Sequence, residues 1–350
     1  MVDTIYIEQQ VREHPRALAV MQRFKHARVI EIERYSEVFN SHGQNFRLQK
    51  QNPSLILAHK SNARLHSTPA QYETGGGANY YFSHMLNCLY DCRYCFLQGM
   101  FQSANYLLFV NFEDFVADIA STAEQHGHDA RPAWFFSGYD CDSLAYDPVT
   151  GFAEHFLAAF EQLPNAVLEL RTKSTQIRSL LARPATPNVV VAYSLSPPAV
   201  ASELEVGAPG FEKRVDAIVR LQQHGWRIGL RFDPVIWHAD YQQDYAGALA
   251  YLFERVDAAQ IDSVTLGGFR LPRDYYKKMQ KLYPEHWLFA AGLNSEASQI
   301  AYRQTLEQEV LGAVETLTRQ YISQQQLYVY PSYEAGPAQQ QGVAELETMR

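Results

Sequence analysis

The sequence predicts an α/β fold whose strands run parallel, and two observations lead to this prediction. After about residue 76, six apolar runs alternate with amphipathic segments of helical periodicity. The runs are nearly continuous rather than alternating, which is typical of strands buried on both faces. Six such repeats suit either an open doubly wound sheet or an incomplete barrel, and both place their chemistry at the carboxyl ends of the strands.

The expected elements follow one another in the order strand, helix, strand. The apolar run "NYYFSHML" (79–86) is expected to be the first strand, and Phe112, Phe115 and Ile119 then recur at helical spacing. Five further strands are expected at 133–138, 166–172, 189–196, 226–235 and 261–268. The helices between them are expected at 152–160, 175–182, 211–224 and 240–257.

Polar residues follow five of these strands directly. Three cysteines come after the first strand, "GYDCDS" after the second, "TKS" after the third, "SLS" after the fourth and "DP" within the end of the fifth. Because the carboxyl ends of parallel strands meet at one edge, the sequence predicts a functional site there. Three units are expected: an N-terminal extension packed on the sheet (1–75), the α/β core (76–290) and a C-terminal helical extension with a tail (291–350).

Composition favours a soluble globular protein. Apolar residues make up 47% of the 350 residues and charged residues 19%, and no apolar run is long enough to span a membrane. The polar start "MVDTIYIEQQ" does not resemble a signal peptide, so a cytoplasmic location is expected. The net charge of −8 argues against a non-specific coat on nucleic acid but allows a local basic groove. Two basic clusters are interpreted as solvated helix faces: Arg23, Lys25, Arg28 and Arg34, and Arg270, Arg273, Lys277, Lys278 and Lys281.

Three of the four cysteines lie within "NCLYDCRYCF", with the spacing C-x3-C-x2-C. Bunched thiols in a long chain are metal ligands or redox groups rather than a disulfide framework. A structural zinc site needs four ligands, and only His84 or Cys141 could complete the set formed by Cys88, Cys92 and Cys95. A four-iron cluster normally takes four thiolates, so three would leave one iron open to a substrate or cofactor. The pattern favours the iron–sulfur cluster, with zinc or unligated thiols as alternatives.

The cysteine motif after the first strand of a βα repeat resembles the radical S-adenosylmethionine superfamily. The strings "CLYDCRYCFLQ", "CDSLAYDP", "LELRTKS", "VAYSLSP" and "FDPV", in that order, look like the spore photoproduct lyase family. The resemblance extends from about residue 45 to about residue 320. It implies a partial (β/α)6 barrel of the TIM type, with N-terminal and C-terminal extensions, that holds a [4Fe–4S] cluster and S-adenosyl-L-methionine.

The resemblance also implies roles for individual residues. In the family, the open iron is chelated by the amino and carboxylate groups of S-adenosylmethionine, whose reductive cleavage gives a 5′-deoxyadenosyl radical. Lys173 matches a lysine on the methionine carboxylate, and Asp140 takes the place of an acidic residue that accepts from the amino group. Three further residues match positions that contact the cofactor or lie beside the cluster: Tyr94, Ser143 and Ser194.

Cys141 matches a cysteine that donates a hydrogen atom to the product radical and does not bind the cluster. A thiol suits this role because its S–H bond is weaker than most C–H bonds; a small buried hydrophobe is the alternative interpretation. The family commonly has tyrosines on both sides of the third cysteine, implicated in returning the radical to the cofactor. Here Tyr94 is present, but Phe96, which has no O–H, follows Cys95. Either Tyr94 pairs with another of the 22 tyrosines, or the cofactor is consumed in each turnover.

The implied reaction is the reversal of a cross-linked thymine dimer in DNA to two thymines. Tyr302 and Arg303 are expected at the family's substrate-binding position. The implied partners are DNA carrying a thymine photolesion and an electron donor such as flavodoxin or ferredoxin, with no membrane partner and a monomeric enzyme. If this function holds, the two basic clusters are candidates to bind the phosphates that flank the lesion. One alternative is a radical enzyme of the same fold that acts on another nucleic-acid lesion or a peptide. A more remote one is a non-catalytic, zinc-stabilised nucleic-acid-binding module.

Overall fold

A curled sheet of parallel strands forms the centre of the molecule. The computed structural model describes residues 2–68, 77–129, 131–289, 293–296 and 298–332. The strand order is β18-β14-β13-β11-β10-β9-β5-β4, in which only β4, at the edge, is antiparallel to its neighbour. The strands of this sheet are β4 (His66–Ser67), β5 (Asn79–Tyr81), β9 (Ala133–Ser137), β10 (Ala166–Thr172), β11 (Val189–Ser194), β13 (Arg227–Val235), β14 (Ile261–Gly268) and β18 (Leu327–Tyr330).

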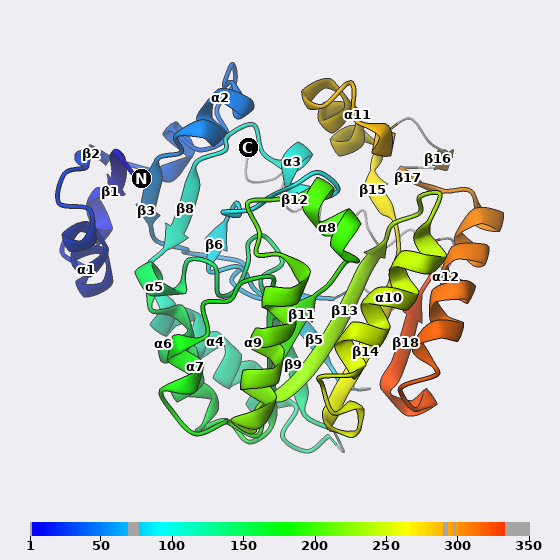
Figure 1. Ribbon diagram of the computed structural model, residues 1–350. Coiled ribbons are helices and arrows are strands. Elements are labelled where there is room, and N and C mark those ends of the chain that lie inside the picture. The colour runs from blue at the N-terminus through cyan, green and yellow to red at the C-terminus, as the bar shows by residue number, and fades with distance from the viewer. Residues whose placement is uncertain (1, 69–76, 130, 290–292, 297, 333–350) are drawn as a thin grey trace.

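Helices connect these strands and cover the outer face of the sheet (Figure 1). They are α4 (Phe112–Gln125), α5 (Asp147–Thr150), α6 (Phe152–Phe160), α7 (Arg178–Leu181), α8 (Pro198–Leu204), α9 (Phe211–Gln223), α10 (Tyr241–Phe253) and α12 (Gln304–Thr318). Each parallel pair is thus joined by a crossover on one side, as expected for βαβ units. The parallel α/β fold that the sequence predicts is confirmed.

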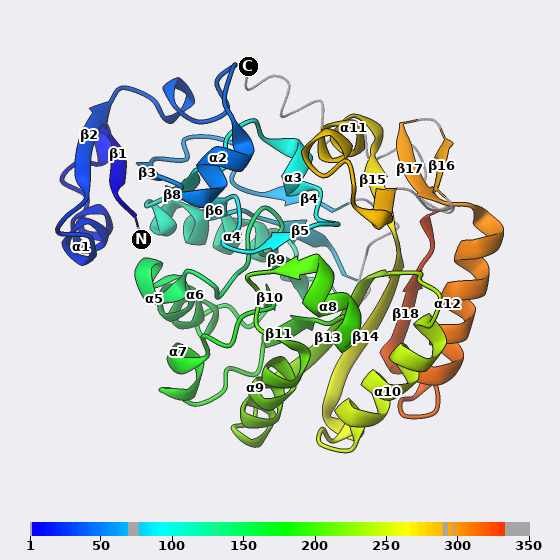
Figure 2. The same ribbon diagram turned by 45° about the horizontal axis from the view of Figure 1, so that its top comes forward.

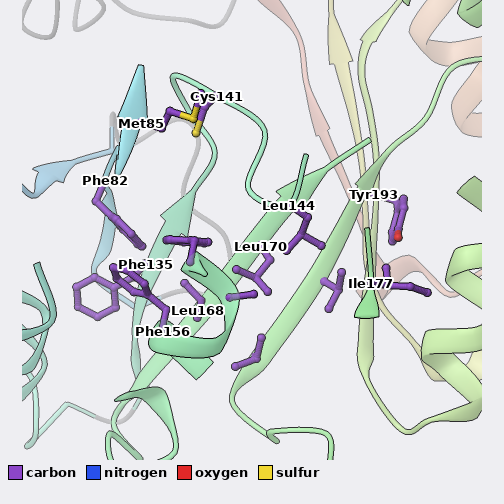
Figure 3. Close-up of a cluster of buried hydrophobic side chains, with 14 of the residues drawn as sticks. Phe82, Met85, Phe135, Cys141, Leu144, Phe156, Leu168, Leu170, Ile177 and Tyr193 are labelled. Atoms are coloured by element: carbon purple, nitrogen blue, oxygen red, sulfur yellow. The ribbon is translucent and has the colours of Figure 1, made fainter. Parts of the chain in front are cut away.

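The side chains of β10 show how the sheet divides the molecule into an outer and an inner face. Leu168 and Leu170 pack among helix residues such as Phe156 in the main core (Figure 3). Since successive side chains on a strand point to opposite faces, Glu169 and Arg171 point to the concave side. The concave face therefore holds charged groups, whereas the face under the helices is apolar.

The predicted first strand, 79–86, is wrong in one respect. The chain forms β5 up to Tyr81 and then leaves the sheet, and β6 (Met85–Leu86) pairs with a strand of a second sheet instead. The tyrosines of β5 are half-buried and β6 is buried, so the apolar run looks continuous although the backbone changes partners at Phe82–His84. The strand β18, which extends the main sheet beyond β14, was not predicted from the sequence.

The second sheet has the order β2-β1-β3-β8-β6. The N-terminal part of the chain supplies most of it, and β8 and β6 come from either side of the cysteine cluster. The remaining elements of this region are β1 (Thr4–Glu8), α1 (Pro15–Arg23), β2 (Arg28–Ile32), α2 (Phe46–Gln51), β3 (Leu55–Ala58) and β8 (Tyr106–Phe109).

Small elements complete the rim at the carboxyl ends of the strands. They are β7 (Asp91–Cys92), α3 (Leu97–Met100), β12 (Glu205–Val206), β15 (Arg270–Pro272), α11 (Arg273–Leu282), β16 (Leu293–Glu296) and β17 (Gln299–Tyr302). Short 3-10 helices lie at Gln9–Val11, Tyr35–Glu37, Ala258–Gln260, Trp287–Phe289 and Gln324–Gln326. Among the described residues, no helix combines the length and apolar character needed to cross a membrane.

The two basic clusters differ from the helix faces that were expected. Arg23 ends α1 and Arg28 begins β2, so the first cluster does not lie on one helix. In the second cluster Arg270 belongs to β15, and only the residues from Arg273 onward share α11. The first interpretation is therefore wrong, and the second holds for the residues of α11.

Candidate active site

The three clustered cysteines lie on the loop between β6 and α3, at the carboxyl edge of the main sheet. Cys92 is buried, Cys88 and Cys95 are half-buried, and none forms a disulfide. The short strand β7 pairs antiparallel with β12, which places Cys92 opposite Glu205. The backbone N–H of Arg93 also donates to the Leu204 carbonyl at 2.7 Å. The segment after α8 therefore holds one side of the cysteine loop.

Lys50 of α2 holds the other side of this loop. Its Nζ donates to the carbonyl oxygens of Cys88 (2.7 Å) and Tyr90 (3.2 Å). Asn87 precedes the first cysteine with φ of 68°, in the left-handed region, and its side chain donates to two backbone carbonyls at 2.8 and 2.7 Å. Asparagine tolerates this conformation better than most residues. Both flanks of the loop are thus fixed by contacts with other elements.

The thiols of the loop are held in their neutral form by their surroundings. Burial raises the pKa of Cys88 to about 12 and raises the pKa of Cys92 well above its usual value. A bound metal reverses this preference, because a coordinating thiol is deprotonated. Among the residues that the structure describes, no group of three His, Cys, Asp or Glu side chains converges closely enough to hold a single metal ion. By their number, three thiolates are one ligand short of a closed tetrahedral zinc site and fit a cluster in which one iron stays open.

The loop after β9 carries Asp140, Cys141 and Ser143. It begins at Gly138, whose φ of +80° favours glycine, and a Cβ there would lie only 2.6 Å from Ser143 Oγ. Asp142 fastens this loop to the end of β10, because its carboxylate accepts from Thr172 Oγ1 and from the backbone N–H of Lys173, each at 2.6 Å. The predicted residues on the ends of β9 and β10 are therefore brought side by side.

Asp140 presents an unsatisfied oxygen at this edge. Its Oδ2 accepts from Ser83 Oγ at 2.6 Å, whereas Oδ1 is buried and has no hydrogen-bond partner among the described residues. Burial raises the pKa of Asp140 above its usual value, although the bond from Ser83 opposes this. A buried carboxylate oxygen without a donor is costly, so this atom is suited to accept from a cationic group of a ligand. The residues present thus fit a cofactor that carries an amino group.

Cys141 is buried beside Met85, above the aromatic core (Figure 3). Its Sγ lies 4.0 Å from Nδ1 of His84, whose ring stacks on Phe152 at 3.7 Å between centroids. Burial raises the pKa of Cys141 well above its usual value, and the nearby Cys88 adds to this effect. Burial also lowers the pKa of His84 to about 3, so this histidine does not act as a base toward the thiol near neutrality. Cys141 therefore keeps its S–H bond.

Lys173 lies at the end of β10, next to Tyr94 of the cysteine loop. Its side chain is 15% exposed, and its Nζ is 4.0 Å from Oε1 of Glu205 and 5.5 Å from the centroid of the Tyr94 ring. Burial alone would lower the pKa of Lys173, but attraction to Cys92 and Glu205 outweighs it and raises the pKa. The ammonium is therefore charged and close to the cysteines.

Glu205 is the centre of the hydrogen bonds on this side of the site. Its carboxylate accepts from the Tyr94 hydroxyl, from the guanidinium of Arg214, and from Ser196 Oγ at 3.0 Å. Arg214 also donates to the Ser194 carbonyl at 3.0 Å. Burial opposes ionisation of Glu205, yet Lys173 and Arg214 together lower its pKa. This network joins the cysteine loop to the ends of β10 and β11.

Ser143 and Ser194, the two serines expected to contact the cofactor, lie on neighbouring parts of the rim. Ser143 is buried, and its Oγ bonds with Ser137 Oγ at 2.8 Å. Ser194 is 8% exposed at the end of β11. The ring of Phe96, in the place of the missing tyrosine, contacts Tyr139 at 5.2 Å between centroids.

The structure places the two expected substrate residues differently from each other. Tyr302 is buried in the same apolar cluster as Cys92 and Tyr94, and its hydroxyl accepts from the backbone N–H of Trp237 at 2.9 Å. Arg303 is exposed and caps α12. The structure thus brings Tyr302 to the cysteine side of the rim and leaves Arg303 at the surface.

Four residues that organise the site were not found from the sequence: Lys50, Asp142, Glu205 and Arg214. Asp142 lies between two predicted residues, so its position within "CDS" gave a usable signal. The others contact the site from distant segments. A lone charged residue in an ordinary helical or loop segment gives no indication of such a contact.

The curled parallel sheet, with clustered cysteines on a loop at its carboxyl edge, defines an α/β half-barrel of the radical S-adenosylmethionine type. The family model described as spore photoproduct lyase matches residues 1–302. The chain therefore belongs to the spore photoproduct lyase family and is a lyase. The resemblance drawn from its sequence motifs is confirmed.

Curated relatives and solved structures agree with this assignment. The chain is 23% identical over 262 residues to a spore photoproduct lyase of Bacillus subtilis (strain 168), covering 73% of this chain and 72% of the relative. It is 20% identical over 211 residues to one of Geobacillus sp. (strain Y412MC61), covering 59% and 61%.

Two solved structures of spore photoproduct lyase mutants share the fold at 16% identity. One, a cysteine-to-serine mutant, has a TM-score of 0.81 and covers 95% of this chain and 99% of its own. The other, with bound AdoMet and dinucleoside spore photoproduct, also has a TM-score of 0.81 and covers 94% and 98%. Their likeness to this chain therefore extends over nearly the whole fold.

Proposed function

We propose that this protein reverts the spore photoproduct, a cross-linked thymine dimer in DNA, to two thymines, using a [4Fe–4S] cluster and S-adenosylmethionine. The observation that carries this proposal is the neutral, buried thiol of Cys141 beside a separate loop of three cysteines. Family membership and the bound AdoMet and dinucleoside spore photoproduct of a solved relative support it.

Cys88, Cys92 and Cys95 would bind three irons of the cluster. When bound, these groups would supply the one-electron chemistry that removes a hydrogen atom from the lesion. The side chains of the protein would orient the cofactor and supply the charges that bind it. Asp140 Oδ1, which has no partner among the described residues, would accept an N–H from the cofactor's amino group. Lys173 binds its carboxylate, because a charged ammonium is already held beside the cysteine loop.

Three further residues complete the cofactor site in this proposal. Ser143 and Ser194 contact the cofactor from the ends of β9 and β11. Tyr94 lies beside the cluster, and its hydroxyl is fixed by Glu205, so its ring has one orientation. The fold thus supplies a prearranged site in which few groups need to reorganise.

Cys141 returns a hydrogen atom to the thymine radical that remains after the dimer separates. The S–H bond breaks, a C–H bond forms on the thymine, and the unpaired electron is left on sulfur. One electron from the external donor and one proton would then restore the thiol. The raised pKa of Cys141 matters here because a thiolate has no hydrogen atom to donate. The surrounding apolar residues also exclude water from the radical.

On the substrate side, Tyr302 and Arg303 hold the lesion once it is turned out of the duplex. Turning the lesion out of the duplex costs a few kcal/mol, and it costs less when the base pairs are already distorted. A small electron carrier such as flavodoxin or ferredoxin reduces the cluster. The enzyme acts in the cytoplasm as a monomer.

The experiment uses protein reconstituted with iron and sulfide without oxygen. With dithionite, S-adenosylmethionine and a dinucleotide spore photoproduct, chromatography is expected to show thymidylyl-thymidine and 5′-deoxyadenosine. Cys92→Ala removes a cluster ligand and is expected to abolish both products. Unchanged cofactor cleavage by this variant would refute the cluster assignment.

Cys141→Ala tests the donor role separately. This variant is expected to cleave the cofactor at a rate close to that of the parent, while the thymine radical forms side products instead of thymidylyl-thymidine. A clean yield of thymidylyl-thymidine from it would remove Cys141 from the mechanism.

A further inference from the structure

Helix α11 carries a basic face. Lys277 and Lys281 are four residues apart and share one side of the helix with the adjacent Lys278, and all three are exposed. Met279, on the opposite side, is fully buried. Asp274 lies 3.8 Å from Lys277, but both side chains are largely exposed, at 86% and 63%. Such a pair is weak and can be replaced by another anion.

This helix is packed directly against the cysteine loop. A Cβ on Gly99 of α3 would lie 2.5 Å from the backbone oxygen of Tyr275, so only glycine allows the two helices to approach this closely. The hydroxyl of Tyr283, after α11, donates to Gln98 Oε1 at 2.8 Å. Figures 1 and 2 both show α11 beside α3 on the rim formed by the carboxyl ends of the strands. The basic face is thus fixed relative to the site.

Two arginines from other elements extend the positive charge along the rim. Arg47 of α2 and Arg93 of the cysteine loop lie over the Tyr283 ring, at 4.8 and 4.2 Å from its centroid. Arg47 also donates to the Leu282 carbonyl at 2.8 Å. Arg93 pairs with Asp91, so part of its charge is balanced. Together, Arg47, Arg93, Lys277, Lys278 and Lys281 form what is here called the rim strip.

The rim strip contrasts with the charge of the rest of the chain, which is −8 overall. We propose that the rim strip binds the sugar–phosphate backbone of duplex DNA beside the lesion. This inference rests on the proposed function, because it assumes that the lesion enters the site from duplex DNA. Cations from three separate elements, spread along one edge, match an extended polyanion better than a compact acidic protein. Phosphate contacts of this kind fix the register of a protein on DNA and do not read its sequence.

The other basic cluster provides a matched control. Arg23, Lys25 and Arg28 lie on and after α1 and at the start of β2, an edge strand of the second sheet. In Figures 1 and 2 these elements lie on the flank of the molecule away from α11. Replacing all three by Gln removes the same charge as replacing the three lysines of α11.

The experiment measures binding of the reconstituted protein to a fluorescent duplex of about two helical turns that contains the lesion, by anisotropy at several KCl concentrations. The triple variant Lys277→Gln, Lys278→Gln, Lys281→Gln is expected to bind at least tenfold more weakly at about 0.1 M salt. The slope of log K against log [KCl] is expected to become shallower by about 2 to 3, since each lost phosphate contact removes about 0.9. The Arg23, Lys25, Arg28 variant is expected to match the parent.

Turnover of the isolated dinucleotide separates this inference from the proposed function. The α11 variant is expected to keep that turnover within about twofold, because a dinucleotide has no flanking backbone. A parent-like salt slope in the α11 variant, or an equal loss in the control variant, overturns the inference. If duplex binding is unchanged and only turnover driven by a flavodoxin falls, the rim strip binds the electron donor instead. Failure of the parent to convert the dinucleotide contradicts the proposed function, while the anisotropy result still decides the inference.

Discussion

Two buried glutamates are each bound by an arginine on a neighbouring element, but they differ in how completely they are paired. Glu169, on the concave face of β10, accepts from Arg231 at 2.7 and 3.3 Å and from Arg171 at 2.8 and 3.1 Å. Glu205, at the rim, is bound by Arg214, Tyr94 and Ser196, while Lys173 stays 4.0 Å away. Each network thus has one carboxylate and two cations. In the inner network both cations are hydrogen-bonded to the carboxylate, whereas in the rim network the Lys173 ammonium is held only loosely.

Close packing reinforces this difference. Gly229 on β13 makes room for the inner network, since a Cβ there would lie 2.7 Å from the guanidinium of Arg231. Arg231 is further bonded to Ser263 Oγ at 3.0 Å. The comparison indicates that the inner network maintains the shape of the half-barrel, whereas the rim network leaves the Lys173 ammonium available to bind a ligand.

The largest expected effect comes from breaking the inner network. Glu169→Ala leaves Arg231, which is 1% exposed, without its counter-charge, and is expected to lower the free energy of unfolding by about 3–5 kcal/mol. Urea denaturation followed by circular dichroism measures this change. Glu161→Ala breaks an Arg–Glu pair at the surface and is expected to change stability by less than about 1 kcal/mol. Equal effects of the two substitutions would contradict the structural role of Glu169.

The inner network also predicts a dependence on pH. Burial opposes ionisation of Glu169, but Arg231 and Arg171 outweigh it and lower its pKa to about 2. Its stabilisation is therefore fully present above the ordinary glutamate pKa, near 4.5, and is lost as the pH falls toward 2. The loss of stability between pH 5 and 2.5 is expected to be shallower in Glu169→Gln than in the parent. Parallel profiles would indicate that other carboxylates dominate acid unfolding.

A smaller effect on stability, but a specific one on binding, is expected at the rim. Lys173→Met removes the loosely held ammonium while Glu205 keeps its other partners, so stability is expected to change by less than about 1 kcal/mol. Loss of a charged hydrogen bond of about 1.5–3 kcal/mol is expected to weaken S-adenosylmethionine binding at least tenfold. Equilibrium dialysis against the reconstituted protein measures this affinity. Lys213→Met, at an exposed position of α9, is the control and is expected to bind like the parent.

The smallest expected effects come from removing one hydroxyl from each network. Tyr94→Phe deletes the hydrogen bond to Glu205, and Ser263→Ala deletes those with Arg231 and Asp262; each variant is expected to lose about 1 kcal/mol of stability. Only Tyr94→Phe is expected to alter the electron paramagnetic resonance spectrum of the reduced cluster, because Tyr94 belongs to the cysteine loop. A changed spectrum in Ser263→Ala as well would remove the distinction between the two networks.

The sequence predicted much of the fold because buried parallel strands give continuous apolar runs. Chemistry at the strand ends was also predictable, since "CDS" and "TKS" directly follow such runs. The sequence could not show that the chain passes from one sheet to the other between Tyr81 and Met85, because the residues on both sides of this point are apolar or aromatic. The last strand, β18, is short and mostly half-buried, so its pattern resembles that of a loop.

The partners of the site residues could not be predicted either. Glu205 and Arg214 look like ordinary residues of a loop and a helix, and their role depends on a contact with Tyr94 across the fold. The role of Lys50 in α2 was equally hidden in the sequence, because it depends on contacts with the backbone of the cysteine loop. Sequence motifs identify the residues that act on ligands. The residues that position those site residues are identified only by three-dimensional contacts.

The pairing of β7 with β12 has a consequence for the order in which the protein matures. Tyr94 and Glu205 are 111 positions apart, so the ribosome must release more than a hundred further residues before the cysteine loop gains its native support. Iron delivered earlier would meet three thiols on an unsupported segment. The cysteine loop therefore gains its native support only after the chain has folded as far as β12, and a ligand that needs the supported loop binds after that step.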